Sequence, residues 1–532
     1  MRFSPITAAG ILAVIFSAAQ PVFGADAIFD TEHFSGSGNC AFCHNGISDG
    51  QGNDVSIEND WSATMMANSS RDPFWQAKFA SELRRNEDIK DVLNDKCTRC
   101  HAPMAHVEDA DNPNGIQFFG DYGFVNPTNL YHDAAMDGVS CTLCHQIADV
   151  NLGLPEGFSG GFSIDKSASP AYGSYTNPRV NPMQRNSGFT PQFATHVSDS
   201  ALCATCHNLK TPVVDATTGK VRDDMEFPEQ AVYTEWEHSD FADGGAEASS
   251  CQECHMASAD RVKIANRPRN LPRRNNFARH GFYGGNTLML DILGANRAEL
   301  DVGNGDFAAA KEATRATLRS AAKVAIEEAS LNGDELIVRV RVTNDTGHKL
   351  PTSYPSRRAY LHLTVADQDG NTLVESGRLE TDPVTGRPTG AIVGVDADTG
   401  IGFEPHYSDE IVHYYDGANI DTGQVQVYEP IMGDTEGNQT YTLLRSKGYL
   451  KDNRIPPRGF NAWKMPEVAV VGEAANDSDF VAGSDLVTYR IQQLPNGTAG
   501  VTVTAELNYQ TLAYGFLRDL KQDAVKEPEN AV

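Results

Sequence analysis

The pattern of apolar and polar residues changes at about residue 331. Beyond this point, short runs place an apolar residue at every second position, the period of a strand with one buried face. Two such runs are clear, and their apolar residues are Leu336, Val338, Val340 and Val342 in the first and Leu361, Leu363 and Val365 in the second. The pattern predicts that residues 331–532 form an antiparallel β-sandwich of the immunoglobulin-like kind.

Turn signals support this prediction. Asp369-Gly370 follows the second run, and Asn496-Gly497 lies between the apolar stretches Leu486 to Ile491 and Val501 to Leu507. Dipeptides of this type favour the tight turns that join antiparallel strands. We therefore expect a β-hairpin at each of the two positions.

Helical periodicity is found in two other stretches. Phe74 to Leu93 carries Phe74, Phe79, Leu83 and Ile89 at spacings that place them on one side of a helix. Ala308 to Glu328 is rich in alanine and predicts a helix within a connecting segment, residues 301–330. Together with the strands, these helices predict an α+β fold.

The first residues have the features of an exported protein. Residues 1–24 combine Arg2, an apolar stretch from Ile6 to Ala19, and the small-residue ending Val22-Phe23-Gly24. This arrangement predicts a secretory signal peptide. No later stretch has the length of apolar sequence that a transmembrane helix needs. We expect a periplasmic, outer-membrane-associated or extracellular protein.

Residues 25–300 contain many turn residues and little regular periodicity, but they repeat one motif five times. The motif is Cys-x-x-Cys-His, in CAFCH, CTRCH, CTLCH, CATCH and CQECH. All ten cysteines belong to it: Cys40, Cys43, Cys97, Cys100, Cys141, Cys144, Cys203, Cys206, Cys251 and Cys254. The histidines that follow them are His44, His101, His145, His207 and His255.

This motif is typical of covalent c-type haem attachment, with two thioether bonds and an axial histidine. A zinc half-site, a redox pair and a disulfide are the alternatives for a single Cys-x-x-Cys. Five motifs cannot divide completely into four-cysteine zinc sites, and no cysteine remains outside them. We therefore predict five haem c groups with iron, which would form the core of a pentahaem cytochrome c domain over residues 25–300.

Each iron needs a second axial ligand to be closed to substrates. Four histidines lie shortly before a motif, and another follows the last motif, so we predict as distal ligands His33, His132, His196, His238 and His280. Three side chains are alternatives for one iron: His106, Met65 and Met66. A methionine ligand would raise the reduction potential relative to histidine. In the strand-rich half, only His348, within TGHKLPTSYPSRR, is a candidate ligand to a haem at the junction.

Charge adds two expectations. A formal net charge of −28 argues against nucleic acid and anionic membranes as partners, and it favours a basic redox partner. One basic run stands out, and its guanidinium groups suit haem propionates. It contains Arg261, Lys263, Arg267, Arg269, Arg273, Arg274 and Arg279. A solvated loop or a docking patch is the alternative for this run. The acidic loop DVGNGD has oxygen donors for calcium, although turns of this composition are commoner without a metal.

The chain resembles the exported multihaem c-type cytochromes of the cytochrome c-552/c-554-like superfamily. The resemblance is carried by GNCAFCHNG, WSATMMANSSRDPFW, DGVSCTLCHQI, LCATCHNLKTPVVD, SCQECHMA and RHGFYGGN, and the GHKLP segment resembles the β domain of larger members. It implies electron transfer through closely packed haems with mostly two histidine ligands each. On matching positions it favours four distal ligands, His132, His196, His238 and His280. Many relatives have histidine where this chain has Met65 and Met66, so we expect His33 as the substitute.

Two functions remain open. The first is an electron carrier without substrate chemistry, in which the strand-rich half could dock to an outer-membrane complex or to another copy of the chain. The second is an oxidoreductase that acts on a small nitrogen or sulfur compound at one open iron. Pentahaem nitrite reductases bind their active-site haem through Cys-x-x-Cys-Lys, a motif that is absent from this sequence.

Overall fold

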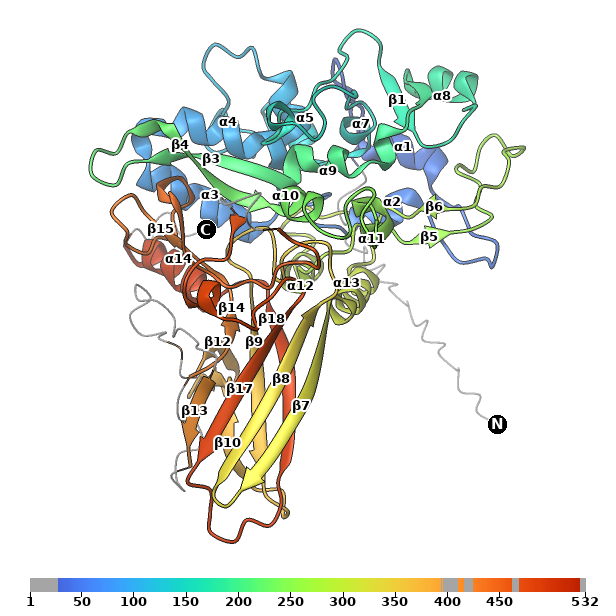
Figure 1. Ribbon diagram of the computed structural model, residues 1–532. Coiled ribbons are helices and arrows are strands. Elements are labelled where there is room, and N and C mark those ends of the chain that lie inside the picture. The colour runs from blue at the N-terminus through green and yellow to red at the C-terminus, as the bar shows by residue number, and fades with distance from the viewer. Residues whose placement is uncertain (1–26, 394, 396–409, 416–423, 462–467, 527–532) are drawn as a thin grey trace, which may run out of the picture.

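The computed structural model describes residues 27–393, 395, 410–415, 424–461 and 468–526. The predicted signal peptide lies outside this range. Helices and strands both contribute, in agreement with the predicted α+β class. Figure 1 shows a helix-rich half and, extending away from it, a half built from long strands.

The helix-rich half consists of short helices. Their bounds are α1 Ser37–His44, α2 Ile57–Ser62, α3 Pro73–Arg85, α4 Lys90–His101, α5 Pro103–Glu108, α6 His132–Met136, α7 Cys141–Cys144, α8 Val180–Ser187, α9 Ser200–His207, α10 Val232–Glu237, α11 Cys251–His255 and α12 Thr287–Ala295. Small sheets join them, formed by β1 Pro170–Gly173 with β2 Thr190–Phe193, β3 Asn208–Val214 with β4 Val221–Ala231, and β5 Ser258–Ala259 with β6 Phe277–Ala278.

The stretch Phe74 to Leu93 is two helices and not one. Helix α3 begins as predicted, because the Asp72 side chain accepts hydrogen bonds from the backbone N–H groups of Phe74 and Trp75. It ends at Arg85, where Asn86 leaves the helical conformation and its side chain donates to the Glu82 carbonyl. A 3₁₀ turn follows, and the chain continues in α4. The polar run between Arg84 and Asp88 offers no apolar contact that would keep one helix straight.

The strand-rich half has two four-stranded sheets. The first has the order β13-β17-β8-β7, and in the second β9 is flanked by β10 and β14 and also pairs with β18. The bounds are β7 Ala322–Asn332, β8 Glu335–Asn344, β9 Arg358–Ala366, β10 Thr372–Ser376, β13 Glu410–Tyr414, β14 Val427–Tyr428, β17 Ser484–Gln492 and β18 Thr502–Gln510. Two-stranded pairs complete this half: β11 Leu379–Thr381 with β12 Pro388–Ile392, and β15 Pro430–Gly433 with β16 Gly448–Asp452.

One buried cluster of apolar side chains is shared by the two sheets. The alternating residues of both predicted strands belong to it, and Leu336, Val338, Val340, Val342, Leu361, Leu363 and Val365 are all at most 1 % exposed. The period-two pattern therefore identified β8 and β9 correctly. The turn at Asp369-Gly370 also joins antiparallel strands, β9 and β10, as predicted.

Three expectations for this half were wrong. The stretches around Asn496-Gly497 form β17 and β18, but β17 pairs with β8 and β13 whereas β18 pairs with β9. Residues 493–501 therefore cross between sheets instead of forming a hairpin. The first sheet is mixed, because β13 runs parallel to β17. Within the connecting segment, helix α13 spans only Phe307–Ala321, and strand β7 begins at Ala322, where Lys323, Val324 and Ala325 pair with β8.

The two halves are interleaved at their junction. The last helix, α14, spans Tyr514–Lys526 and returns to α3, where Arg85 bonds to Asp519 and Asp523 at 2.9 Å each. The segment before β16 also reaches the C-terminal end of α3, since Arg445 donates to the Asn86 side chain and to the Arg85 carbonyl. Figure 1 shows α12, at the edge of the helix-rich half, together with α13 and α14 at the junction with the sheets. Within the described ranges, no helix has the length and apolar character needed to cross a bilayer.

Candidate functional site

The five Cys-x-x-Cys-His motifs all lie on short helices or at their ends. They belong to α1, α4, α7, α9 and α11. Residues three and four apart lie on one face of a helix, so the spacing directs both sulfurs and the imidazole of a motif toward the same side. None of the ten cysteines forms a disulfide. The local fold therefore supplies the arrangement that a bound macrocycle requires.

Four of the five motif histidines are oriented in the same way. The Nδ1–H groups of His44, His101, His145 and His255 each donate to a backbone carbonyl at 2.6 to 3.0 Å, from Ile264, Ser69, Tyr172 and Tyr283 respectively. A hydrogen bond at Nδ1 fixes the tautomer that leaves Nε2 as a metal ligand. At His101 the ring also stacks on Trp75, with 4.3 Å between the centroids.

Thiols from different motifs are neighbours. Cys40 and Cys141, Cys100 and Cys206, and Cys203 and Cys251 lie close enough for each thiol to shift the pKa of the other. The first motif therefore neighbours the third, and the fourth motif neighbours both the second and the fifth. The Cys206 charge also raises the pKa of Cys144, after the larger effect of burial, which places the third motif near the fourth. All five motifs thus form one connected group.

Two motif histidines face a second histidine across a gap of defined width. The ring centroids of His145 and His280 are 6.3 Å apart with 31° between the planes, and those of His255 and His348 are 6.3 Å apart with 15° between the planes. Burial lowers the pKa of His280 to about 3 and that of His348 to about 4. Both rings are therefore neutral at pH 7, the state that a metal ligand requires.

This width matches two imidazoles that bind one metal ion from opposite sides. A ligating nitrogen lies about 2 Å from a first-row metal, as at zinc, and the ring centroid lies about 1 Å beyond it, so opposed rings have centroids roughly 6 Å apart. Direct stacking would bring the rings closer, as for Trp75 and His101. The residues therefore fit an iron between each pair. Of the predicted distal ligands, His280 is placed opposite a motif histidine, and the junction candidate His348 is placed opposite another.

His348 is held in place by a buried group of charges between the two halves. Its Nδ1–H donates to the Lys349 carbonyl at 2.9 Å, and the Lys349 ammonium bonds to Asp452 at 2.6 Å. Asp452 also accepts from Arg454 at 2.7 and 2.8 Å, and Glu235 of α10 accepts from the backbone N–H of Lys349 at 3.0 Å. Against the effect of burial, Arg454 and Lys349 hold the pKa of Asp452 below its ordinary value.

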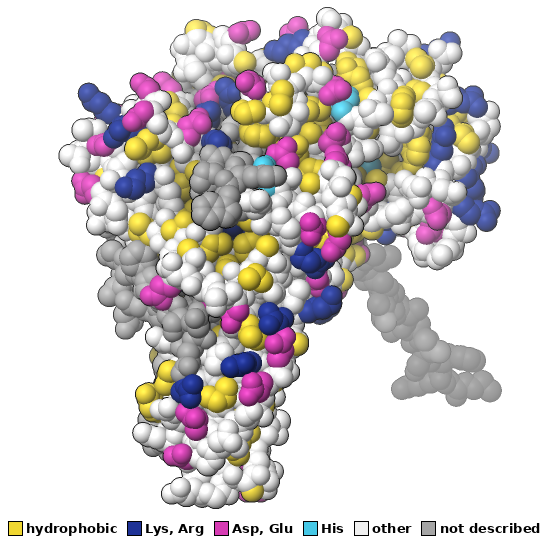
Figure 2. Space-filling view, viewed as in Figure 1, with side chains coloured by type: hydrophobic (Ala, Val, Ile, Leu, Met, Phe, Trp, Pro, Cys, Tyr) yellow, Lys and Arg dark blue, Asp and Glu magenta, His cyan; other side chains and the backbone are white. Residues whose placement is uncertain are grey.

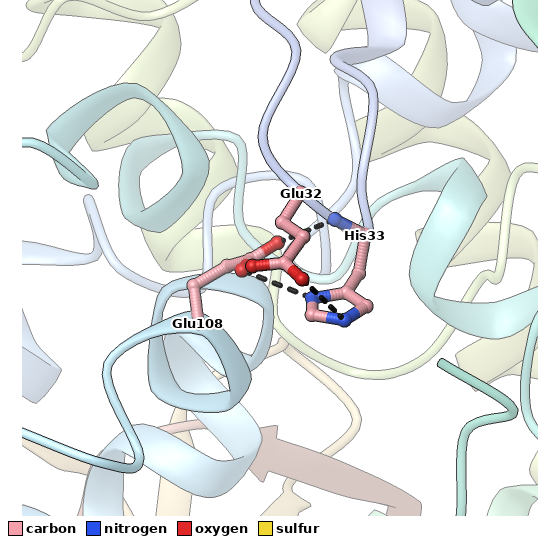
Figure 3. A group of neighbouring side chains, drawn as sticks. All are labelled: Glu32, His33 and Glu108. Carbon is pink, nitrogen blue, oxygen red and sulfur yellow. Dashed lines mark hydrogen bonds and ion pairs between the residues drawn. The ribbon is translucent and has the colours of Figure 1, made fainter. Parts of the chain in front are cut away.

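His33 is anchored by a carboxylate from α5. Its Nδ1–H donates to Glu108 at 3.1 Å, and its backbone N–H donates to the other Glu108 oxygen at 2.8 Å (Figure 3). Glu32, which is exposed, lies 3.9 Å from Nε2. A carboxylate behind a ligating histidine is a common arrangement at metal sites, because it orients the ring and increases its basicity. The geometry suits a ligand that uses Nε2.

The other predicted distal ligands differ in the nitrogen that they leave available. In His132 and His238, Nδ1–H donates to the carbonyls of Phe124 at 2.8 Å and Thr234 at 3.0 Å, so Nε2 is available. In His196, Nε2–H donates to the Ile147 carbonyl at 2.9 Å, which leaves Nδ1. The ring contacts do not place any of these three opposite a motif histidine.

The three alternative ligands, His106, Met65 and Met66, differ in how they pack. Both nitrogens of His106 face helix α4, with Nδ1 2.9 Å from the Thr98 hydroxyl and Nε2 3.9 Å from Asp95. This geometry makes His106 a side chain that packs on its own motif helix. Met65 packs against the apolar cluster formed by α12, α13 and their neighbours. Met66 lies beside the third motif, because its backbone carbonyl accepts a hydrogen bond from the Val139 N–H at 3.0 Å.

Most of the basic run is on the surface. Arg261, Arg267, Arg269 and Arg273 are exposed, and Figure 2 shows basic side chains gathered at the edge of the helix-rich half where Figure 1 places β5 and β6. Arg279 forms an ion pair with Asp60, which uses its guanidinium group. The alternative of a solvated loop describes the exposed part of the run better than propionate pairing does.

Two guanidinium nitrogens remain available inside the protein. Nε of Arg274, in the basic run, and Nε of Arg71 are buried without a hydrogen-bond partner among the described residues. Burial lowers the pKa of Arg71, although Asp137, Asp301 and Asp133 are near enough to oppose this effect. Arg71 was not predicted from the sequence, where its only signal was its place five residues after Met66.

A further buried acid, Glu229 of β4, lies near the second motif. Its charge, together with those of Glu82 and Asp95, adds to the effect of burial in raising the pKa of Cys97. Burial and then Glu82 raise the pKa of Glu229 itself to about 8, despite Gln230 and Lys78. The Tyr354 hydroxyl, buried and without a hydrogen-bond partner among the described residues, lies in the same region.

We expect Glu229 to make the folded state less stable as the pH rises. The pKa of Glu229 in the folded state is above the ordinary value of 4.5. Its favourable contribution to the free energy of unfolding is therefore fully present below about pH 4.5 and is lost as the pH rises to about 8. Glu229→Gln should remove this part of the pH dependence and stabilise the protein at pH 8 by a few kcal/mol, since each pKa unit corresponds to about 1.4 kcal/mol. Thermal unfolding between pH 5 and pH 8 measures it. Glu226→Gln, at an exposed position of the same strand, is the control, and equal pH profiles for the two variants would contradict the expectation.

Comparisons with known proteins give one structural likeness. No family model matches the chain, and no curated protein matches it significantly. The chain is similar to a penta-haem cytochrome c552 from Thermochromatium tepidum, known from its crystal structure, with 15% identity and a TM-score of 0.48. The likeness covers 93% of this chain and 95% of that chain.

Proposed function

We propose that the protein transfers electrons through five covalently attached c-type haems, most of them ligated by two histidines. The observation that carries the proposal is the pair of histidine couples, His145 with His280 and His255 with His348, each with ring centroids 6.3 Å apart. In each couple one member follows a Cys-x-x-Cys, so the two histidines would bind the iron of the haem attached to those cysteines.

The remaining irons have enough candidate ligands. His44, His101 and His207 would be the proximal ligands, and four histidines are available for their distal positions: His33, His132, His196 and His238. Anchored Nδ1 groups prepare His33, His132 and His238 for ligation through Nε2, whereas His196 would ligate through Nδ1. Bound haem would supply an Fe(III)/Fe(II) couple. The protein would tune its potential through ligand type, burial and hydrogen bonds to the ligands.

The contacts between motifs support an order for the electron path. Three pairs of thiols from different motifs are near enough to affect each other's pKa: Cys40 with Cys141, Cys144 with Cys206, and Cys206 with Cys100. These contacts connect the first motif to the third, the third to the fourth and the fourth to the second. The fifth motif joins at the fourth through Cys203 and Cys251. The path would thus branch at the haem of CATCH. Arg71 and Arg274 would bind propionates through their buried Nε groups.

Location and architecture complete the proposal. A c-type cytochrome with a signal peptide would act in the periplasm, at the outer membrane or outside the cell. We further propose that the two sheets that share one core form the immunoglobulin-like β-sandwich, as a module joined to a haem-cored domain over residues 25–300. Basic redox proteins, an outer-membrane complex or further copies of the chain would be its partners, because the charge of −28 disfavours acidic ones.

Counting the haems tests the proposal. The exported chain should carry five haems per polypeptide by pyridine haemochrome assay and by mass, and Cys251→Ser with Cys254→Ser should lower the number to four, because the fifth motif loses both of its sulfurs. Electron paramagnetic resonance of the oxidised protein should show low-spin haem throughout. Ser249→Ala, next to the fifth motif, is the control and should retain all five. A variant that keeps five haems, or an intact chain with none, would refute the assignment.

A substantial high-spin fraction in the intact chain would have a different meaning. It would indicate an iron without a distal ligand and would favour the oxidoreductase alternative. Turnover of nitrite, hydroxylamine or sulfite by the same preparation would then identify the compound on which that iron acts.

A further inference from the structure

A basic loop lies between strands β5 and β6. The two short strands pair with each other, and the loop consists of residues 260–276. It contains six basic residues and one acidic residue, in a chain with a formal net charge of −28. The basic residues are Arg261, Lys263, Arg267, Arg269, Arg273 and Arg274. The loop therefore reverses, locally, the charge of the protein.

The cations of the basic loop are not neutralised by carboxylates of the protein. Among the residues that the structure describes, none of the six forms an ion pair, whereas Arg279, just beyond the loop, pairs with Asp60. Figure 2 shows basic side chains gathered at this edge of the molecule. Four of the six are exposed: Arg261, Arg267, Arg269 and Arg273. Their positive charges thus remain available to a partner.

The backbone of the basic loop is held in a defined shape. Val262 and Arg274 exchange backbone hydrogen bonds at 2.7 and 2.9 Å, which close the base of the loop. Farther along, the Lys263 ammonium donates to the Arg269 carbonyl at 2.8 Å. The exposed guanidinium groups are therefore presented from fixed backbone positions.

The basic loop is bound to the helix of the first Cys-x-x-Cys-His motif. The Asn266 N–H donates to the Cys43 carbonyl at 2.8 Å, and its side-chain amide donates to the Asn45 carbonyl at 2.8 Å. The motif histidine, His44, donates in turn to the Ile264 carbonyl at 2.8 Å. Figure 1 shows α1 at the same edge of the helix-rich half as β5 and β6. The loop and the first motif therefore form one structural unit.

Arg267 lies where this unit reaches the surface. Its guanidinium group is 5.0 Å from the centroid of the Phe42 ring, and Phe42, within the first motif, is 59 % exposed. Burial raises the pKa of Cys43, and the charge of the nearby Arg267 opposes this effect. The thioether edge of a c-type haem is opposite to its propionate edge. Arg267 is thus on the side away from the propionates of a haem at this motif, so its charge suits a different anionic group.

We propose that the basic loop, together with Phe42, is the docking surface for an acidic electron-transfer protein, which exchanges electrons with the haem of the first motif. The inference rests on the proposed function for the presence of that haem. Arginine and aromatic side chains are the residues that contribute most to binding at protein interfaces. Exposed cations around an exposed ring next to a Cys-x-x-Cys-His motif would bring acidic side chains of the partner to the edge of the macrocycle.

The acidity of the rest of the chain favours the basic loop further. The net charge of −28 repels an acidic protein from most of the molecule, so the loop is the part of the surface at which attraction outweighs repulsion. Complementary charge orients a partner before contact and raises the rate of association. A transient redox complex needs only a small interface, below about 1,200 Å², so one loop and one exposed ring suffice. Basic partners would bind elsewhere, on the acidic surface.

Binding between two oxidised proteins tests the surface without electron transfer. The probe is flavodoxin, an acidic flavoprotein, and isothermal titration calorimetry at an ionic strength of about 0.01 M, where the Debye length is about 30 Å, should detect one flavodoxin per holoprotein. Arg267→Gln with Arg269→Gln should weaken this binding at least about fivefold, because two contacts between opposite charges are lost. Lys220→Gln with Arg387→Gln is the matched control. It removes the same charge from two other exposed turns and should bind flavodoxin as the natural chain does.

The salt dependence of electron transfer provides the second test. Reduced flavodoxin loses one electron, the Fe(III) of a haem gains it and becomes Fe(II), and stopped-flow absorption follows the haem. The second-order rate should fall as the ionic strength rises from about 0.01 M to about 0.1 M, which shortens the Debye length from about 30 Å to about 10 Å. Two proteins that meet through their net negative charges would show the opposite trend. The variant with Arg267→Gln and Arg269→Gln should react more slowly at low salt and lose most of the salt dependence.

Three results would overturn the proposal: no binding of flavodoxin at low salt, equal weakening in the control variant, or a rate that rises with salt. Neutral reduced lumiflavin should reduce the natural chain and the variants equally fast, and a slower reaction in the loop variant alone would mean that the substitutions damage the haem itself. Self-association of the natural chain, measured by sedimentation velocity and abolished in the loop variant, would assign the loop to a contact between copies and would also overturn the proposal. Haem content tests the proposed function separately, because the calorimetry requires no electron transfer.

Discussion

Replacement of His348 with alanine is expected to convert one haem in five to a high-spin form, while the other four stay low-spin. The His348 ring lies 6.3 Å from that of His255, nearly parallel to it, and burial keeps it neutral. On the proposed ligation, the alanine variant leaves the iron at CQECH without a distal ligand. Electron paramagnetic resonance and the near-infrared absorption of the oxidised protein measure the high-spin fraction.

Two further variants make this experiment decisive. His348→Met should restore a low-spin iron with a higher reduction potential than that of the natural chain, because a thioether replaces an imidazole. His362→Ala removes a histidine of the same half that is bonded to Glu375 at 2.8 Å, and it should leave the haem spectra unchanged. An unchanged spectrum in His348→Ala would show that His255 has another partner, and it would remove this couple from the proposal.

Asp452→Asn is expected to destabilise the junction by about 3 to 5 kcal/mol, the range for breaking a buried ion pair by removing one partner. Lys349 and Arg454 both bond to this carboxylate, and the Lys349 and Asp452 side chains are 0 % exposed. Without the charge, Glu235 would be the counter-ion that the two buried cations share among the residues that the structure describes. Because Lys349 follows His348 directly, the variant should also increase the high-spin fraction at lower denaturant concentrations than in the natural chain.

Denaturant unfolding followed by both far-ultraviolet circular dichroism and the haem spectrum measures these two effects. Asp434→Asn is the control, because Asp434 accepts hydrogen bonds from the N–H groups of Glu436 and Asn438 in an exposed turn. We expect it to cost less than about 1 kcal/mol. Similar losses in the two variants would mean that the buried group contributes no more to stability than an ordinary turn.

The alternation of apolar and polar residues predicted individual strands of the fold. The alternation in β8 and β9 identified both strands and their buried faces, because one face of each strand packs in the shared core. The pairing of strands that lie far apart in the sequence could not be predicted from local pattern. The turn at Asn496-Gly497 is consistent with a hairpin in sequence, yet β18 pairs with β9 in the other sheet. The helix over 308–328 ends early because β8 offers the edge on which residues 322–332 form β7.

In the candidate site, too, features within one short segment were predictable, whereas contacts between distant segments were not. The motif spacing indicates which cysteines and histidines would attach haem, because c-type attachment requires only five consecutive residues. Distal ligands depend on how distant segments meet, so proximity in sequence was a weaker guide. His280 was predicted and lies opposite His145, whereas His348 comes from the strand-rich half and was considered only as a candidate at the junction. Arg71 has no sequence signal that separates it from a surface arginine.

The origin of His348 in the strand-rich half has a consequence for biogenesis. A chain exported from its N-terminus delivers Cys251 and Cys254 before residue 348, so thioether bonds at the fifth motif would form while the second axial ligand is still absent. Covalent attachment would then retain the haem during the interval, and closure of its iron would wait for the folding of β8 and the docking of Lys349 and Asp452. On the proposed function, maturation would end with the assembly of the strand-rich half.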